Sequence, residues 1–442
     1  MNLFDFLEEQ ENKQDKVQGL NLEAKLEDVI EGESIKGDSV NKKLLIIDGS
    51  SLLSTSFYGT AKDLMFAKTD EQRELAYKKL MQTSTGIYTN GVYGFMKTLN
   101  KILDNQKPSH LAVVFDLSRE TTFRKQMYSD YKGTRKKSPQ PLREQFKLMQ
   151  EVLEYIGVPV LKSLEYEADD FAGSLAKKFE DEIPVYCHTK DHDYLQLISH
   201  NTRVWMVTSK CEEMFNEVGL NKSDFNLPDG VFEYTLTTFT DIQGLEYPEQ
   251  IIDMKALIGD SSDNIPGVHG VGEKAVIPLL REYENIETIY SEIECLTPKE
   301  EKEFKKFAKE NLGIARLPLT NLLKNGVITL SSGDEIEYNC IFGDLTEEQI
   351  SNQELFKSKL NDLRFPIEIK TEGGLELLKA NDVVDIKLSA KESAFLSKEL
   401  ATIKTDILEV QDMNLDDLLV NINKDKYNKK MMELEMKSLV RK

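Results

Sequence analysis

Short apolar runs separated by helical patterns are the feature that most limits the fold of this chain. Four runs indicate buried β-strands, because each is rich in aliphatic residues and ends at polar or turn-forming positions. Between them, apolar residues recur at helical spacing. Strands that alternate with helices favour an α/β fold, with a parallel sheet covered on both faces. The strands are expected at Lys43–Ile47, His110–Asp116, Ile183–Asp191 and Arg203–Val207, and the helices at Val92–Asp104, Leu142–Ile156 and Asp169–Phe179.

Acidic residues follow the carboxyl ends of the expected strands. In open parallel sheets, that edge carries the groups that bind ligands. One acid at a strand end is commonly a helix cap or a turn residue. A set of acids at one edge is harder to explain in that way, because their mutual repulsion must be offset by cations. The set comprises Asp48, Asp116, Glu167, Asp169, Asp170, Asp191 and Asp193.

Three of these acids stand where a helix is expected to begin, in the segment YEADDFAGSLAKKF that starts at Tyr166. On a helix, Glu167 and Asp170 would share one face, and Asp169 would lie about 100° away from Asp170. A helix N-terminus stabilises an exposed negative charge by only about 0.3–1 kcal/mol. Divalent ions are therefore a better counter-charge, and oxygen ligands without histidine favour Mg²⁺ or Mn²⁺ over zinc.

A second pair of acids, Asp260 and Asp263, precedes a glycine-rich turn in the segment LIGDSSDNIPGVHGVGEKAVIPLL. The pattern predicts a helix, a turn and a second helix. Backbone amides in such a turn, together with the N-terminus of the next helix, suit a phosphate of a nucleic-acid strand. A glycine-rich turn alone is about as often a plain connector, but the acids on its leading side strengthen the interpretation. The candidate residues of the turn are Gly267, Gly270, Gly272 and Lys274.

The formal charge of −21 argues, by itself, against a nucleic-acid partner. The basic residues are concentrated, however, because residues 119–143 hold eight of them against two acids, a local charge of +6. A basic segment can bind phosphates whatever the charge of the whole chain, and a solvated loop is the alternative. The eight are Arg119, Arg124, Lys125, Lys132, Arg135, Lys136, Lys137 and Arg143.

Together these motifs resemble the flap endonuclease, or 5′-3′ exonuclease, superfamily, and most closely the 5′-nuclease domain of bacterial family A DNA polymerases. The resemblance implies a PIN-like fold, a mainly parallel sheet flanked by helices, with a helical arch and a helix–two-turn–helix (H3TH) subdomain that binds DNA. The similar segments are LLIIDGSSLL, GVYGFMKTL, AVVFDLSRETTFRKQMYSDYKGTR, LREQF, YEADDFAGSLAKKF, TKDHDYLQLIS and EQIIDMKALIGDSSDNIPGVHGVGEKAV, followed near the end by LSKELATIKTDILEV and MKSLVRK.

Carried over position by position, the resemblance implies a site for two Mg²⁺ ions, which Mn²⁺ could replace. Lys132 and Arg135 resemble the residues that contact the scissile phosphate. Arg124, Tyr131 and Lys136 would contact DNA beside them, although a packed tyrosine is an equally good interpretation of Tyr131. The glycine-rich turn resembles one that grips duplex DNA with a bound K⁺. The implied metal ligands are Asp48, Asp116, Glu167, Asp169, Asp170, Asp191, Asp193, Asp260 and Asp263.

The expected organisation has five parts, and the segment 296–385 departs most from the family. That segment indicates charged helices and a hairpin, GVITLSSGDEIEYN, and we assign it no role. The parts are an acidic, disordered tail at 1–42, a catalytic domain at 43–250 with the arch near 119–143, the H3TH subdomain at 251–295, an insertion at 296–385, and a closing segment at 386–442.

The resemblance implies a structure-specific 5′-3′ exonuclease and flap endonuclease of replication and repair. Its expected substrates are DNA with 5′ flaps, nicks or 5′ ends, and RNA–DNA hybrids, recognised by junction shape rather than by base. A scaffold that holds DNA junctions without cutting them would need only the turn and the basic segment. A small-molecule phosphatase would leave both of these unexplained. The full set of acids therefore favours the nuclease.

Other features of the sequence concern partners and location. No apolar run reaches the ~18 residues of a membrane span, and the first residues are acidic where a secretory signal would be basic. The four cysteines form no CxxC pair, which is typical of a reduced cytosolic protein. We therefore expect a monomeric, stand-alone nuclease in the cytoplasm of a bacterial or phage-infected cell, without a membrane partner.

A small apolar cluster, Leu3, Phe4, Phe6 and Leu7, stands at the start of the acidic tail. It resembles loosely the peptides by which replication proteins bind a sliding clamp, but it lacks their usual glutamine. A frayed terminus is the alternative.

Overall fold

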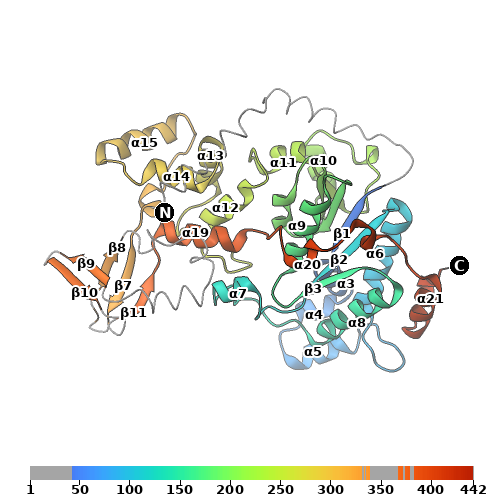
Figure 1. The fold of residues 1–442 in the computed structure, drawn as a ribbon. Coiled ribbons are helices and arrows are strands. Elements are labelled where there is room, and N and C mark those ends of the chain that lie inside the picture. The colour runs from blue at the N-terminus through green and yellow to red at the C-terminus, as the bar shows by residue number, and fades with distance from the viewer. Residues whose placement is uncertain are drawn as a thin grey trace. The chain divides into compact units, whose positions relative to one another are not determined.

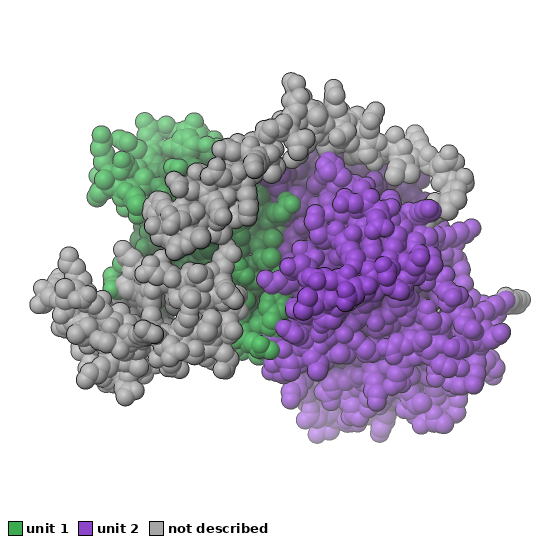
Figure 2. Space-filling model, in the orientation of Figure 1, with its two compact units in different colours: residues 1–37, 123–135, 249–402 green, residues 38–122, 136–248, 403–442 purple. Residues whose placement is uncertain are grey.

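The computed structural model describes residues 42–330, 333, 335–338, 367–371, 374–378 and 383–441. Within these residues the chain forms two compact units, which Figure 2 shows in different colours. Unit 1 holds residues 123–135 and 249–402, and unit 2 holds residues 38–122, 136–248 and 403–442, each as far as it is described. Each unit therefore combines segments that lie far apart in the sequence. The tail and its apolar cluster lie outside the described residues.

A six-stranded sheet forms the centre of unit 2 (Figure 1). Its strands are β1 (Leu44–Asp48), β2 (His110–Asp116), β3 (Val160–Ser163), β4 (Val185–Thr189), β5 (Thr202–Val207) and β6 (Val231–Tyr234). The order across the sheet is β3-β2-β1-β4-β5-β6. The first five run parallel to their neighbours, and β6 is antiparallel to β5. The expected mainly parallel sheet is confirmed, and all four expected strands are present with small shifts at their ends.

Helices enclose this sheet, and their bounds include the three helical segments expected from the sequence. They are α3 (Gly49–Thr60), α4 (Lys62–Phe66), α5 (Asp70–Tyr77), α6 (Asn90–Gln106), α8 (Gln140–Ile156), α9 (Ala168–Phe179), α10 (Cys211–Glu217) and α11 (Leu236–Gln243). Successive side chains of a strand point to opposite faces. Leu45 and Ile47 of β1 belong to a core with residues of α3, α6 and α8, and Ile46, which points the other way, is also fully buried. Both faces of the sheet are therefore covered.

The last part of the chain completes unit 2. Val420 N donates to the carbonyl oxygen of Ser109 at 3.0 Å, just before β2. The helices of this segment are α20 (Leu408–Gln411) and α21 (Lys424–Glu433), and the side chains of Tyr427 and Met431 on α21 join the same core as β1. The residues after 402 thus pack as the closing part of the unit that contains the sheet.

Unit 1 is mainly helical. Its helices are α7 (Phe123–Met127), α12 (Gln250–Ile258), α13 (Glu273–Tyr283), α14 (Ile286–Ile293), α15 (Pro298–Glu310), α16 (Leu319–Leu322) and α19 (Ala390–Ala401). The glycine-rich turn lies between α12 and α13, as the helix–turn–helix pattern predicted. Lys398 on α19 holds two of these helices together, because its Nζ lies 2.9 Å from Asp253 Oδ1 on α12 and 2.7 Å from Glu287 Oε2 on α14. None of the helices in the described residues is long and apolar enough to cross a bilayer.

The hairpin expected in the segment 296–385 is present. Strands β7 (Gly326–Leu330) and β8 (Glu335–Tyr338) pair antiparallel, and β11 (Val383–Lys387) pairs with β7 on its other side. A two-stranded sheet is formed by β9 (Ile367–Thr371) and β10 (Gly374–Leu378). Residues 331–332, 334, 339–366, 372–373 and 379–382 lie outside the described residues, and the role of the segment 296–385 stays unassigned.

Two glycines bring the backbone into close contact with itself at the turn after α12. Gly259 and Gly267 have positive φ angles of 74° and 59°. A Cβ atom on Gly267 would stand 2.2 Å from the backbone nitrogen of Gly259. Gly267 is also bonded to α19, since its N donates to Ser397 Oγ at 2.9 Å and its carbonyl accepts from Ser393 Oγ at 2.6 Å. The turn therefore has no room for a side chain at Gly267.

The substitution Gly267→Ala is expected to lower the free energy of unfolding by roughly 3 kcal/mol, because the new methyl group meets backbone and alanine disfavours positive φ. Gly59→Ala in α3 is the matched control, since, apart from its neighbours in the helix, no heavy atom of the described residues lies within 4 Å of the position that its methyl group would take. It should be neutral or stabilise by up to about 1 kcal/mol. Urea unfolding followed by circular dichroism measures both variants. Equal effects would show that the turn can relax around a side chain.

Candidate functional site

The strand ends of unit 2 bring acids to one edge of its sheet. Asp48 is the last residue of β1 and Asp116 the last residue of β2, and these strands are parallel neighbours. Strand β4 lies on the other side of β1 and ends at Thr189, two residues before Asp191. Parallel neighbours end at the same edge, so the predicted gathering of acids at the carboxyl ends of the strands is confirmed. Their role as metal ligands stays a prediction.

Asp48, at the end of β1, is buried, with a residue exposure of 6%. Its Oδ1 caps α3 by accepting from Ser51 N at 2.8 Å, and its Oδ2 accepts from Thr189 Oγ1 at 2.8 Å. Burial, and next the charge of Asp116, raise the pKa of Asp48 to about 7. Thr189 was not among the residues expected from the sequence, because no motif signals a threonine that orients a carboxylate on the neighbouring strand.

The acids at the start of α9 take part in capping this helix. Glu167 precedes the helix as its N-cap, and Asp170 reaches back so that its Oδ2 accepts from Glu167 N at 3.0 Å. The other oxygen of Asp170 accepts from Lys404 N at 2.9 Å. Asp169 Oδ1 accepts from the backbone N of Asp170 at 2.8 Å. Asp170 is fully buried and bonds backbone amides through both oxygens, so it anchors the start of α9 and the closing segment whatever else it does.

Two further acids follow β4: Asp191 stands just before the short helix η1 (His192–Leu197), and Asp193 lies within it. Asp191 caps this helix, with Oδ1 accepting from Asp193 N at 3.0 Å, and its own N donates to Thr189 Oγ1 at 3.0 Å. Asp191 is exposed, whereas Asp193 is buried. His192, between them, is also exposed. Thr189 thus connects Asp48 and Asp191 by its hydroxyl.

These acids have the chemistry of a site for hard cations, but they are not a preformed coordination shell. Within the described part of the chain, no three acidic, histidine or cysteine side chains stand close enough together to hold a metal ion. The ligands on offer are carboxylate oxygens, which suit Mg²⁺ or Mn²⁺. The charges of Asp116 and Asp191 both raise the pKa of Asp48, and no lysine or arginine is among its main influences. A divalent ion would relieve this excess of negative charge.

In unit 1, by contrast, each candidate acid has a cation beside it. Lys255 Nζ lies 2.8 Å from Asp260 Oδ2, and Ser262 N donates to Asp260 Oδ1 at 2.7 Å. Burial alone would raise the pKa of Asp260, but the charge of Lys255 and these hydrogen bonds outweigh it and lower the pKa to about 2. Lys255 was also not expected from the sequence, since a lysine on a helix is ordinary without knowledge of the turn that follows.

Asp263 contacts both of the cations that were predicted to contact the scissile phosphate. Its Oδ1 pairs with Arg135 Nη2, and its Oδ2 lies 3.6 Å from Lys132 Nζ. Tyr131 OH donates to the same Oδ2 at 3.2 Å. Burial raises the pKa of Asp263, but the charges of Lys132 and Arg135 bring it below its ordinary value. Within unit 1, therefore, Lys132 and Arg135 are brought together by one carboxylate.

The backbone of Lys132 is strained. Its φ of 53° lies in the left-handed region, and its N donates to the carbonyl oxygen of Asp263 at 2.7 Å. A residue other than glycine in this conformation costs on the order of 1–3 kcal/mol and persists where its surroundings require it. Here the surrounding contacts hold the lysine against the loop of Asp263, which marks the position as one of functional interest.

The other residues predicted to contact DNA from the basic segment differ in exposure. Arg124 is 1% exposed, and its guanidinium donates to the carbonyl oxygens of Leu400 at 3.0 Å and Thr402 at 2.7 Å. Tyr131 is 2% exposed, in a core cluster that includes Leu400. Lys136 is exposed. The structure thus shows Arg124 and Tyr131 as packed residues and Lys136 as accessible, and DNA contact by any of them stays a prediction.

The candidate residues of the glycine-rich turn also divide into two kinds. Gly267 is buried and bonded to α19, so its part is structural. Gly270, with a φ of 76°, is exposed, and a Cβ there would stand 2.3 Å from Asn321 Nδ2. Gly272 caps α13, and Lys274 lies in the first turn of that helix, both exposed. Of these four candidates, the last three are therefore the ones that a ligand could reach.

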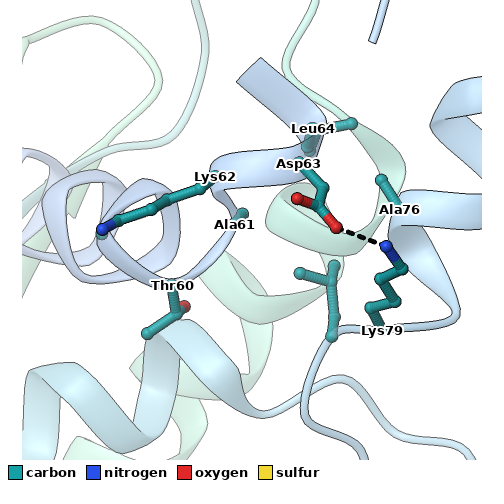
Figure 3. Close-up of a pocket in the computed structure, with 9 residues that line it drawn as sticks. Thr60, Ala61, Lys62, Asp63, Leu64, Ala76 and Lys79 are labelled. Carbon is teal, nitrogen blue, oxygen red and sulfur yellow. Dashed lines mark hydrogen bonds and ion pairs between the residues drawn. The ribbon is translucent and has the colours of Figure 1, made fainter. Parts of the chain in front are cut away.

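A pocket of about 240 Å³ lies among α3, α4 and α5 (Figure 3). Lys79 Nζ pairs with Asp63 Oδ2 at its edge, at 2.6 Å, and both side chains are well exposed. An exposed pair of this kind contributes little to stability. None of the candidate acids, cations or turn residues lines this pocket, so the acids and not the pocket remain the candidate site.

A parallel sheet with acids along one edge, together with a helical unit that carries a glycine-rich turn, is the arrangement expected of a nuclease. Comparison with known proteins agrees. Residues 43–223 match the profile of the 5′-3′ exonuclease N-terminal resolvase-like domain, and residues 246–325 that of the 5′-3′ exonuclease C-terminal SAM fold. A 5′-3′ exonuclease of Halalkalibacterium halodurans is 34% identical over 265 residues, which cover 60% of this chain and 77% of that protein. The chain belongs to the 5′-3′ exonuclease family.

Longer relatives share the same region. DNA polymerase I of Bacillus subtilis is 38% identical over 264 residues, which cover 59% of this chain and 26% of the polymerase. The chain thus spans about a quarter of the length of that relative. Among solved structures, T5 5′-exonuclease with bound zinc ions is 21% identical with a TM-score of 0.40, over 64% of this chain and 92% of that one. The second family profile extends through residue 325, into the segment 296–385 that was expected to be an insertion.

The raised pKa of Asp48 predicts that this residue makes stability depend on pH. Because the unfolded chain loses this proton at lower pH than the folded protein, the contribution of Asp48 to stability falls as pH rises from about 4 to about 7. Asp48→Asn removes this effect. Relative to wild type, its free energy of unfolding should therefore rise by on the order of 3 kcal/mol between pH 4 and pH 8.

Thermal unfolding in EDTA at several pH values measures this difference. Asp181→Asn is the control, because Asp181 is an exposed acid of the same unit. The pH dependence of its stability should be parallel to that of wild type. If Asp48→Asn also runs parallel, the carboxyl of Asp48 is not the buried, raised-pKa group described above.

Burial of Arg124 predicts a role in stability rather than in DNA contact. Arg124→Met should lower the free energy of unfolding by about 3 kcal/mol, because the carbonyl oxygens of Leu400 and Thr402 lose a charged donor. Lys136→Met should change it by less than about 0.5 kcal/mol. Urea unfolding measures stability, and fluorescence anisotropy with a labelled 5′-flap duplex in EDTA measures affinity. A stable Arg124→Met with weakened DNA binding would reverse the assignment.

Proposed function

We propose that this protein is a metal-dependent 5′-3′ exonuclease and flap endonuclease that hydrolyses phosphodiester bonds near the 5′ end of DNA. The observation that carries the proposal is the gathering of acids at the carboxyl edge of the sheet, where Asp48 has its pKa raised to about 7 with two further acids among the causes. Family membership supports the same reaction. A fold that only held DNA would have no use for so much uncompensated negative charge at one edge.

In this proposal the acids of unit 2 hold two Mg²⁺ ions. Asp48, Asp116 and Asp191 follow parallel strands, so rigid elements set their spacing. Glu167 and Asp169 stand at the start of α9, which is anchored by the buried Asp170. When bound, the ions would activate water and stabilise the leaving oxygen. Asp193, Asp260 and Asp263 complete the predicted ligand set, and their part in metal binding rests on the sequence resemblance.

Lys132 and Arg135 are proposed to neutralise charge on the scissile phosphate. Both already lie beside a carboxylate, Asp263, which shows that their side chains can converge on one anion. A phosphate oxygen offers the same charge and the same acceptor geometry, and an arginine fork binds either group. Positive groups placed where negative charge develops in the reaction are an effective source of rate acceleration.

The proposed substrates are DNA with 5′ flaps, nicks or free 5′ ends, and RNA–DNA hybrids. The exposed Gly270, Gly272 and Lys274 would hold duplex phosphates at the start of α13, with K⁺ at the turn. Base readout is not needed, because contacts to phosphates carry no sequence information. Action as a monomer and docking to a sliding clamp through residues 3–7 are parts of the proposal that rest on the sequence alone.

The proposal predicts Mg²⁺-dependent cutting of a 5′-flap duplex by the purified chain. Asp191→Ala combined with Asp193→Ala should lower the single-turnover rate at least 100-fold, because two acids beside the reacting phosphate are removed. Glu182→Ala is the control, since Glu182 is an exposed acid in the turn before β4. It should cut at the wild-type rate.

The outcome separates two classes of function. Tight binding of the flap without cutting in Mg²⁺ or Mn²⁺ would refute the nuclease proposal and favour a scaffold that holds DNA junctions. Undiminished cutting by the double variant would place the chemistry elsewhere in the protein. Product lengths from the flap, compared with those from a nicked RNA–DNA hybrid, would show which substrate is preferred.

A further inference from the structure

The hydroxyl group of Tyr194 is buried in unit 2. This tyrosine lies in η1 directly after Asp193, and its exposure is 1%. Its oxygen has no hydrogen-bonding partner among the residues that the structure describes. Buried tyrosine hydroxyls usually have a partner. An unpartnered one in the core of unit 2 therefore calls for an explanation.

The groups around the phenol suggest one. After burial, the charges of Asp48 and Asp169 are the largest influences on Tyr194, Asp116 also contributes, and all of them raise its pKa well above the ordinary value. The side chain thus keeps its O–H as a donor. The three acids belong to β1, α9 and β2, and η1 packs against α9. The geometry agrees, because Asp191, the N-cap of η1, and Asp48 are both bonded to the hydroxyl of Thr189, so η1 begins beside the acid that ends β1.

Asp48 can accept a further hydrogen bond, from the hydroxyl group of Tyr194. It already accepts one hydrogen bond on each oxygen, from Ser51 N and from Thr189 Oγ1. A carboxylate oxygen has two acceptor sites, so room remains on both. A donor that bonds to a metal-binding carboxylate fixes the orientation of that carboxylate. Removing such a donor typically weakens metal affinity by roughly 10–100-fold.

We propose that Tyr194 is a positioning residue of the metal site, whose hydroxyl donates a hydrogen bond to Asp48 when the carboxylates close around a divalent ion. This inference rests on the proposed function, since it needs the ion. In this proposal the hydroxyl gains its partner only when the ion binds, and a buried hydroxyl without a partner destabilises the fold. Tyr194 therefore acts in opposite directions on the metal-free and the metal-bound protein.

The test compares Tyr194→Phe with wild type and with Tyr290→Phe. Tyr290 is the matched control, because its hydroxyl is also buried, without a partner among the described residues, but lies in α14 of unit 1. Calorimetric titration with Mn²⁺ alone gives the affinity. Thermal unfolding in EDTA and in saturating Mn²⁺ gives the effect on each form. We expect Tyr194→Phe to bind Mn²⁺ roughly 10-fold more weakly, and Tyr290→Phe to bind it as wild type does.

Stability supplies the second readout. In EDTA, both variants should melt at or above the temperature of wild type, because each loses an unsatisfied hydroxyl. In Mn²⁺, Tyr194→Phe should gain less stability than wild type, whereas Tyr290→Phe should gain the same. If wild type binds Mn²⁺ and Tyr194→Phe binds it equally well, the role of Tyr194 is refuted and the metal site stands. If wild type binds no Mn²⁺, both the metal site and this inference are refuted.

Discussion

Repulsion between carboxylates at one edge of a sheet is the constraint on which the rest of unit 2 depends. Desolvation makes it severe, since Asp48 is buried and its pKa is raised to about 7, with Asp116 and Asp191 contributing to the shift. Such a site persists only if other interactions hold the acids in place. Backbone amides do so here, because Ser51 N binds Asp48, Ala168 N binds Asp116 and Asp193 N binds Asp191. Each amide belongs to the start of a helix, where N–H groups lack partners within the helix and favour negative charge.

The same arrangement links the site to the closing segment of the chain. Asp170 uses one oxygen for the start of α9 and the other for Lys404 N. Ser174, one turn further along α9, donates to the carbonyl oxygen of Lys404 at 3.1 Å. A segment more than 200 residues away in sequence is thus bonded to the helix that carries Glu167 and Asp169. The core behind these acids, with Phe171 and Phe179 buried, makes α9 a rigid support for their spacing.

Much of this could be predicted from the sequence because it depends on local patterns. Apolar runs such as Leu44–Ile47, and the acids that follow them, can be recognised in the sequence. The parallel topology then places these acids at one edge of the sheet. What could not be predicted depends on contacts between distant segments. The burial of Arg124 follows from carbonyl groups near residue 400, and the support of Asp48 by Thr189 follows from strand order. At the start of α9, Glu167 lies before the helix and Asp170 bonds back to its backbone N, a cap that the spacing alone does not specify.

The two units differ in the counter-charge that their buried acids have, and this difference bears on function. In unit 1, Lys255 accompanies Asp260, while Lys132 and Arg135 accompany Asp263, and the pKa of each acid is lowered. These carboxylates are ionised at neutral pH and have their counter-charge within the chain. Asp48 in unit 2 has a pKa of about 7, so near neutral pH a proton supplies part of its counter-charge. A cation that binds there must release that proton, so its affinity should rise with pH. No lysine or arginine is among the main influences on the pKa of Asp48, which is the property that the metal site proposed for this edge requires.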